Sequence, residues 1–253
     1  MLREILTLDI FSFFVVFARV GTAIMLIPGI GAVYVSPRIR LSFALAVTFV
    51  AILMVGESIP APPAGPAALA LLIVGEVVIG AFLGTIARIL IAALQTAGTL
   101  VALFASLSNA FVQDPIAEQQ SSTVSGFLAT VGLTLIFVTG MDHLMLRAII
   151  DSYSLFEPGQ PVPYGDLNDV VARHVAASFA LGLQLSAPFL ILAMTYYIGL
   201  GLLGRLMPQL QVFFFGLPVQ IAMHIWLMMV ALSGMMLVFM TRFRDGFAGL
   251  LAP

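Results

Sequence analysis

The chain has 253 residues, of which 61% are hydrophobic and only 9% are charged. Soluble domains carry about 25% charged residues, so a water-soluble fold is excluded. The formal net charge of −2 argues against nucleic acid as a partner, and the absence of cysteine excludes disulfides and thiolate metal sites. We therefore expect an integral membrane protein.

Apolar blocks separated by short polar connections follow one another along the chain. They lie at about 8–30, 41–56, 67–112, 124–150, 175–203 and 212–240. Residues 57–66 contain four prolines and cannot be helical throughout, and residues 151–173 form the longest polar segment. This pattern predicts an all-α membrane protein, and we expect residues 1–253 to form a single integral-membrane domain.

The block at 67–112 is too long for one ordinary membrane span. From Ala67 to Ala110 a single helix would be about 66 Å long, roughly twice the hydrocarbon thickness of a bilayer. It therefore either turns back near Arg88 or leaves the bilayer. Glu76 and Arg88 are charged residues inside it, and two roles stay open for them. They lock neighbouring subunits or form a proton-linked site, or they snorkel from helix ends.

Gly80 and Gly84 form a G-x-x-x-G pattern in the same block. Two small residues one turn apart let another helix approach closely. We therefore include both glycines among the packing residues.

The segment 104–125 joins two apolar blocks and is too long for a tight turn. Phe104, Phe111 and Val112 alternate with small polar residues such as Ser106, and Asp114-Pro115 interrupts any helix. Two interpretations remain open. The segment is a surface loop with a few buried anchors, or it is a flexible apolar plug that closes an aqueous path, because apolar constrictions can gate a channel by excluding water.

The stretch at 202–221 places polar groups and prolines inside an apolar run. Its interrupting residues are Arg205, Pro208, Gln209, Pro218 and Gln220. Hydrocarbon cannot satisfy these groups, so other protein or a water-filled cavity must do so. Backbone of this kind is not expected in a plain membrane anchor.

No pattern in the sequence points to catalysis. The three histidines, at 143, 174 and 224, do not have metal-ligand spacing. Neither a G-x-S-x-G nucleophile motif nor a phosphate-binding glycine loop is present. We expect no enzymatic activity, no metal and no cofactor.

Four motifs resemble the FliR family, the flagellar type III export-gate proteins whose injectisome counterpart is the T-component. They span nearly the whole chain in matching order, at Arg19–Val47, Gly75–Gly84, Phe111–Pro115 and Leu200–Ile221. The most specific is G-L-L-x-R-x-x-P-Q-x-x-x-F-x-x-G-x-P, which runs from Gly201 through Gly216 to Pro218.

The resemblance implies a non-enzymatic subunit of an export gate in the bacterial inner membrane, at the flagellar basal body. Its implied partners are FliP and FliQ subunits, FlhB and unfolded polypeptides in transit. Its helical hairpins would stack with those of the partners into a hetero-oligomeric cone. The loop at 104–122 matches the segment that plugs the closed channel in this family, and the signature at 201–218 implies a packing role.

Two other function classes are alternatives to an export gate. A secondary transporter for a small substrate would also use broken helices and buried charge, but it predicts paired broken segments in two related halves. The sequence has one strong interrupted motif. An intramembrane hydrolase would need a nucleophile and a base, and no such constellation is present.

Overall fold

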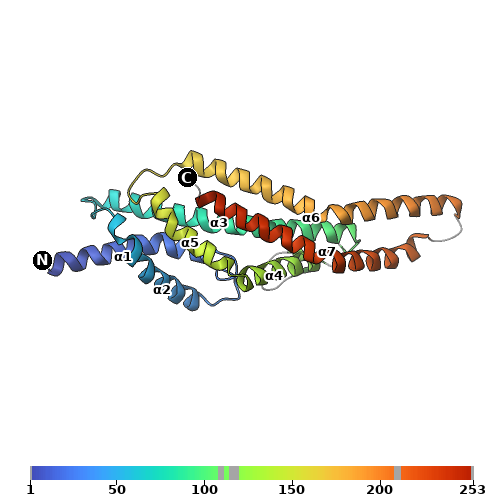
Figure 1. Cartoon of the computed structure of the whole chain (residues 1–253), viewed down its shortest axis with the longest axis horizontal. Coiled ribbons are helices and arrows are strands. Elements are labelled where there is room, and N and C mark those ends of the chain that lie inside the picture. The colour runs from blue at the N-terminus through green and yellow to red at the C-terminus, as the bar shows by residue number, and fades with distance from the viewer. Residues whose placement is uncertain (1, 108–110, 114–119, 208–211, 252–253) are drawn as a thin grey trace. The chain divides into compact units, whose positions relative to one another are not determined.

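The structure is a computed structural model that describes residues 2–107, 111–113, 120–207 and 212–251. Helices dominate these residues and confirm the predicted all-α class (Figure 1). The helices are α1 (Leu2–Leu26), α2 (Pro37–Val55), η1 (Gly56–Ser58), α3 (Pro66–Phe104), α4 (Thr123–Val138), α5 (Met141–Leu155), α6 (Tyr164–Leu206) and α7 (Val212–Leu251). Two short strands, β1 (Phe111–Gln113) and β2 (Gln120–Ser122), pair antiparallel with Val112 opposite Ser121.

The expectation of a membrane protein is confirmed by the length and composition of the helices. Among the described residues, four helices are long and apolar enough to cross a membrane, in α2, α3, α6 and α7. A fifth span results if α4 and α5, which bend at a short break, are counted together. The break contains Gly140 with a φ of +73°, a left-handed conformation that glycine adopts without steric cost.

Helix α3 decides between the alternatives for the block at 67–112. It is one unbroken helix of 39 residues, about 58 Å long, so the chain does not turn back at Arg88. Arg88 lies in the middle of α3 and is exposed, while Glu76 is ten residues from its start and buried. The interpretation that these charges snorkel from helix ends is therefore wrong.

Local sequence explains where α2 begins and why no long helix directly precedes α3. Ser36 caps α2, because its side-chain oxygen accepts a hydrogen bond from the Ile39 backbone, and Pro37 occupies the first helical turn. The predicted non-helical stretch at 57–66 is confirmed, since η1 ends at Ser58 and α3 begins only at Pro66.

The proline-containing stretch at 202–221 corresponds to the connection between two long helices. Helix α6 ends at Leu206 and α7 begins at Val212, while Pro218 is inside α7. Our reading of Pro218 as an interruption of the helix is therefore wrong, since α7 continues through it to Leu251. Pro208 and Gln209 lie outside the described residues.

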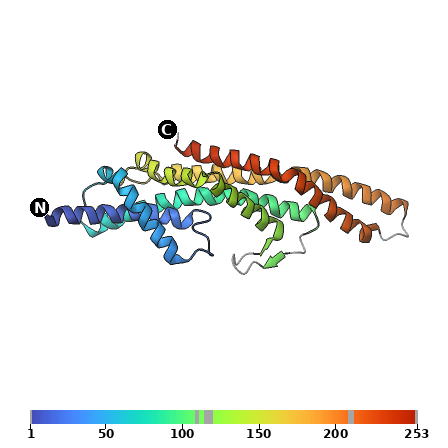
Figure 2. The same cartoon turned by 60° about the horizontal axis from the view of Figure 1, so that its bottom comes forward.

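The chain divides into two compact units, and α3, α4, α6 and α7 each contribute to both. Unit 1 comprises Met1–Leu90, Ile136–Val175 and Arg244–Pro253, and unit 2 comprises Ile91–Leu135 and Ala176–Phe243. Within unit 1, α1 and α2 pack as a hairpin, as Figures 1 and 2 both show. That residues 1–253 form a single domain stays a prediction.

Candidate functional site

The connection between α3 and α4, residues 105–122, begins with a defined helix stop; we call it the gate segment. The Leu107 amide donates to the carbonyl of Ala102, and the Ser106 amide donates to that of Leu103. These two bonds are the Schellman arrangement that ends many helices. Ser106 occupies its left-handed position, with φ of +58°. Glycine is usual there, so a serine carries roughly 1–2 kcal/mol of backbone strain.

Side chains from α6 and α7 hold the entry of the gate segment. The Gln220 Nε2 group donates to the Phe104 carbonyl at 2.8 Å and to the Tyr197 hydroxyl at 3.0 Å. The Tyr197 hydroxyl also lies 3.0 Å from Ser106 Oγ. We call these four residues the latch, because they tie the end of α3 to the two other helices at the start of the gate segment. The latch brings together three of the predicted site residues.

In the latch only the donor group of the Gln220 amide, Nε2, makes hydrogen bonds. Gln220 Oε1 is buried and has no hydrogen-bond partner among the described residues, and the same is true of Nε2 of His224. A buried acceptor without a donor costs free energy, about 1–3 kcal/mol. The amide is therefore not locked on its acceptor side, so it is easier to release than a fully satisfied one.

The exit of the gate segment is fixed by close packing of α4 on α3. A Cβ atom on Gly98 would overlap the backbone of Ser125, so only glycine allows this approach. The Ser125 hydroxyl donates to the Gln95 carbonyl at 3.0 Å. The gate segment therefore leaves and returns to fixed positions, and its β1–β2 ribbon projects away from the helices (Figure 2).

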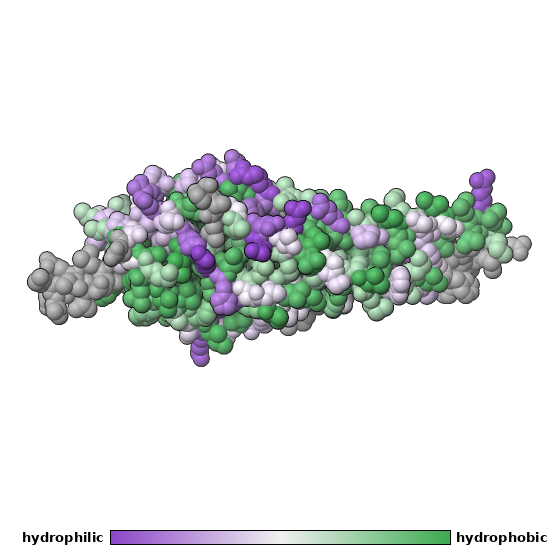
Figure 3. Space-filling model, viewed as in Figure 1, coloured by the Kyte–Doolittle hydropathy of each residue, from purple (hydrophilic) through white to green (hydrophobic). Residues whose placement is uncertain are grey.

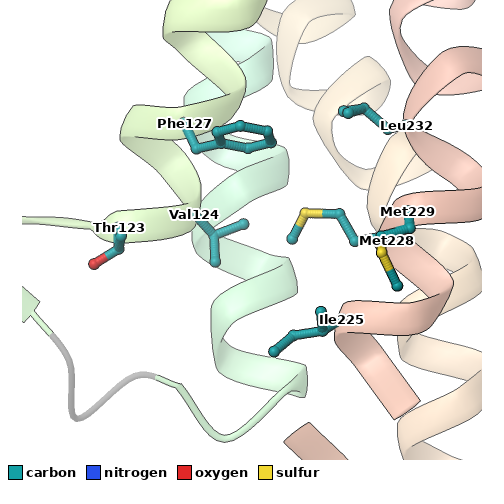
Figure 4. Close-up of a pocket in the computed structure, with 7 residues that line it drawn as sticks. All are labelled: Thr123, Val124, Phe127, Ile225, Met228, Met229 and Leu232. Carbon is teal, nitrogen blue, oxygen red and sulfur yellow. The ribbon is translucent and has the colours of Figure 1, made fainter. Parts of the chain in front are cut away.

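An apolar groove of about 350 Å³ lies beside the exit of the gate segment, between α4 and α7 (Figure 4). Val124 and Phe127 of α4 face Ile225 and Met228 of α7 across it. Methionine side chains adapt their shape to what they contact. Apart from Thr123 its lining is apolar, so the groove suits packing against an apolar surface.

Unit 1 contains a buried ion pair that joins several helices. Arg19 of α1 donates to Glu76 of α3 from Nε at 2.7 Å and from Nη2 at 3.1 Å. Its other donors reach the carbonyl and hydroxyl of Ser152 at 3.1 and 3.2 Å and the Phe156 carbonyl at 2.8 Å. The guanidinium also lies 4.0 Å from the ring centre of Tyr153. All five N–H donors of a fully buried arginine are thus used.

The close approach of α1 and α3 explains how this ion pair forms. Gly80 is one turn after Glu76, and a Cβ atom there would overlap the Arg19 carbonyl. Gly84, one turn further on, contacts Ala23 and Leu26 of α1 in the same way. The helix expected to approach the G-x-x-x-G pattern is therefore α1 of the same chain.

Replacing Gly80 by alanine is expected to destabilise unit 1 by about 1–3 kcal/mol, because backbone atoms must move apart. The chain has no cysteine, so Ala87→Cys, at a fully buried position, provides a unique thiol whose labelling under increasing denaturant reports unfolding. Gly199→Ala is the matched control, since space is open around Gly199, and it should be neutral or stabilising by up to about 1 kcal/mol. Equal labelling curves for the two variants would contradict the packing argument.

The remaining predicted site residues are not gathered into one place. Gly216 accepts a hydrogen bond from the Tyr196 hydroxyl at 2.6 Å. Arg205 is exposed in the last turn of α6, where its charge favours the helix dipole, and Pro218 is exposed on α7. Phe111 and Val112 are in β1, and only their backbone is described. Asp114 and Pro115 lie outside the described residues.

Sequence reasoning missed Arg19 and Tyr197 as site residues. Arg19 had a usable signal, because it is the one charge between Ile10 and Ile27 in an apolar run and had to find a buried partner. Tyr197 had none, since tyrosine is common near membrane interfaces and its partners are about 20 and 90 residues away.

Comparison with known proteins gives the family. The family described as bacterial export proteins, family 1, matches residues 10–246. The flagellar biosynthetic protein FliR of Caulobacter vibrioides is 36% identical, over 91% of this chain and 92% of that protein. FliR of Bacillus subtilis is 32% identical, over 89% and 88%. The Yop proteins translocation protein T of Yersinia pestis is 29% identical, over 66% and 65%. The chain therefore belongs to the FliR family of bacterial export proteins.

Proposed function

We propose that the chain is a non-enzymatic subunit of the flagellar type III protein export gate. It helps to form the channel through which unfolded polypeptides are secreted, and its gate segment closes that channel. The observation that carries the proposal is the latch: three helices converge on the start of one long connection and hold it by hydrogen bonds that can be released.

The gate segment has the properties that a closing element needs. Both of its ends are fixed on packed helices, at the latch and at the contact of Gly98 with Ser125. Ser106, in the helix stop at its start, is strained, and the latch amide is unsatisfied on one side. Strain and partial satisfaction lower the free energy needed to move the segment, so substrate entering the channel can displace it.

The lengths of α3 and α6 support assembly with partners. At 39 and 43 residues they are about 58 and 64 Å long, and a bilayer covers only about 30 Å of apolar surface. Yet large hydrophobic side chains are exposed along both, among them Leu71, Leu103, Phe179 and Leu203. We propose that FliP, FliQ and FlhB cover this surface, in the bacterial inner membrane at the flagellar basal body.

We propose that the chain belongs to a flagellar export gate and not to an injectisome, because the flagellar relatives are more similar to it. FliR proteins match at 36% and 32% identity over about nine-tenths of the chain. The injectisome relatives match at 29% and 25% over about three-fifths to two-thirds of it.

Co-expression with the neighbouring export genes tests the assignment. Native mass spectrometry after gentle solubilisation is expected to show the chain in a hetero-oligomer. A secondary transporter would instead appear alone or as a homo-oligomer, and that result would contradict the gate. Gly216→Ile is a useful variant, because a Cβ atom added at Gly216 would lie only 3.0 Å from Cδ2 of Leu200 in the same chain. It should lower the yield of complex, whereas Gly204→Ala, with open space around Gly204, should not.

A further inference from the structure

A second cleft, in unit 1, is distinct from the gate segment. It has a volume of about 560 Å³ and lies between the first turns of α6 and the last turns of α7, over α3 and α5. This volume is within the usual range for small-molecule sites. Apolar side chains form one part of the lining, including Phe82, Leu83 and Leu155. Ionisable side chains form the other part, so the cleft suits an amphiphilic ligand.

The ionisable residues of the cleft carry both signs of charge. Asp166 and Arg173 are two turns apart on α6, and Asp245 comes from α7. All three are exposed, and none is within ion-pair distance of an opposite charge among the described residues. A simple anion would face two carboxylates, and a simple cation would face the guanidinium. A ligand with one group of each sign satisfies all three.

His174 adds a further acceptor to the lining. Its Nδ1 atom lies 2.9 Å from the Val170 carbonyl, so Nδ1 carries the proton and Nε2 of the neutral ring is an acceptor. With the carboxylates of Asp166 and Asp245 the cleft then presents three acceptor groups. A primary ammonium group has three N–H donors, so its hydrogen-bonding capacity matches this set.

The position of the cleft along α6 and α7 indicates the source of such a ligand. On α6 the apolar run begins at Val175, directly after Arg173 and His174. On α7 it ends at Met240, shortly before Arg244 and Asp245. Figure 3 shows hydrophilic residues over the first turns of α6 beside hydrophobic surface. The boundary between apolar and polar residues therefore passes through the cleft, and in a membrane this is the level of lipid headgroups.

We propose that this cleft binds the zwitterionic headgroup of a phospholipid of the phosphatidylethanolamine class. The phosphate pairs with Arg173, because guanidinium and phosphate form strong bidentate hydrogen bonds. The ammonium group lies among Asp166, Asp245 and His174. The upper part of the acyl chains covers Phe82 and Leu155. The gate segment takes no part in this site, so it does not depend on the export function.

Native mass spectrometry of the full-length chain, titrated in detergent with dioleoyl phosphatidylethanolamine or dioleoyl phosphatidylglycerol, tests the proposal. We expect the ethanolamine lipid to be retained about fivefold better, because the glycerol headgroup has no cation for the two carboxylates. The double variant Asp166→Asn/Asp245→Asn should lose most of this preference. Arg173→Gln should weaken both lipids.

Asp169→Asn is the matched control, since Asp169 is an exposed acid on α6 that does not line the cleft. It should leave both lipids unchanged. Equal retention of the two lipids by the native chain would overturn the proposal, and so would an unchanged preference in the double variant.

A protein occupant is distinguished by cross-linking. If Gly249→Cys, which lies in the cleft, cross-linked a co-expressed export subunit at high yield, a polypeptide would fill the cleft and the lipid proposal would be wrong. The substitutions of Asp166, Asp169, Arg173 and Asp245 are at exposed side chains, so thiol labelling at Ala87→Cys should show unchanged stability in these variants.

Discussion

Deletion of residues 106–120 is expected to make the assembled export gate leak ions and small solutes. This deletion removes most of the gate segment and keeps both helix ends at which it is anchored. An apolar closure works by excluding water from a narrow path, so its removal leaves the path hydrated. The measurement is the conductance of the purified hetero-oligomer in planar bilayers, compared with that of the native complex.

A graded variant tests the latch without removing the segment. Gln220→Met keeps the size of the side chain but removes the hydrogen bonds to Phe104 and Tyr197. Each such bond contributes about 0.5–1.5 kcal/mol, so the open fraction should rise roughly tenfold. Gln184→Met is the matched control, because Gln184 is exposed on α6 and outside the latch, and its conductance should equal that of the native gate.

The conductance of the deletion decides the proposed role of residues 106–120. A deleted complex that assembles with all its subunits and conducts no more than the native one would show that another element closes the channel. The latch would then be a structural contact at the end of α3. Composition of the complex should be checked by native mass spectrometry in the same preparation, so that failed assembly is not taken for closure.

Arg19→Met is expected to destabilise unit 1 by roughly 3–5 kcal/mol, since the Glu76 carboxylate stays buried without its partner. The Phe156 carbonyl loses the hydrogen bond from Arg19 in the same step, and the Ser152 carbonyl loses one of its two donors and keeps the Phe156 amide. The result should be a large shift of the labelling curve for Ala87→Cys to lower denaturant. Less protein should also accumulate in the membrane, because destabilised chains are degraded.

Two controls separate the ion pair from a general effect of losing an arginine. Arg88→Met removes an exposed arginine from the middle of α3 and should change stability by no more than about 0.5 kcal/mol. The double variant Arg19→Met/Glu76→Met removes both charges and should recover part of the loss. If the double variant were no more stable than Arg19→Met, the uncompensated carboxylate would not be the cause.

The sequence was sufficient for the class of the fold and the membrane setting. Apolar composition and block length predicted the helices, and the prolines at 60–66 marked the non-helical connection before α3. The continuity of α3 could not be predicted, because nothing in its sequence distinguishes a helix that leaves the bilayer from one that turns back. Its end at Phe104 was hidden for a related reason, since the stop uses Ser106 in place of glycine.

The candidate site was predicted in part. The sequence predicted three of the latch residues, Gln220, Phe104 and Ser106, but placed them in two separate groups. Phe104 and Gln220 are 116 positions apart in the chain. Only the packing of α3, α6 and α7 in unit 2 shows that they form one latch. For Glu76 the sequence suggested a contact with a neighbouring subunit, but its partner is Arg19 of the same chain. The spacing of charges within one apolar block could not reveal this pair.

The partners of Arg19 also set an order on biogenesis. Glu76 is synthesised 57 residues after it, and Ser152 and Phe156 follow at separations of 133 and 137. Until residue 156 has left the ribosome, α1 therefore carries a guanidinium that lacks part of its final shell. A charge in hydrocarbon is costly, so we expect α1 to reach its native place only after α5 has been made. Among the helices that contribute to this shell, α1 comes earliest in the chain, and we expect it to be among the last to settle.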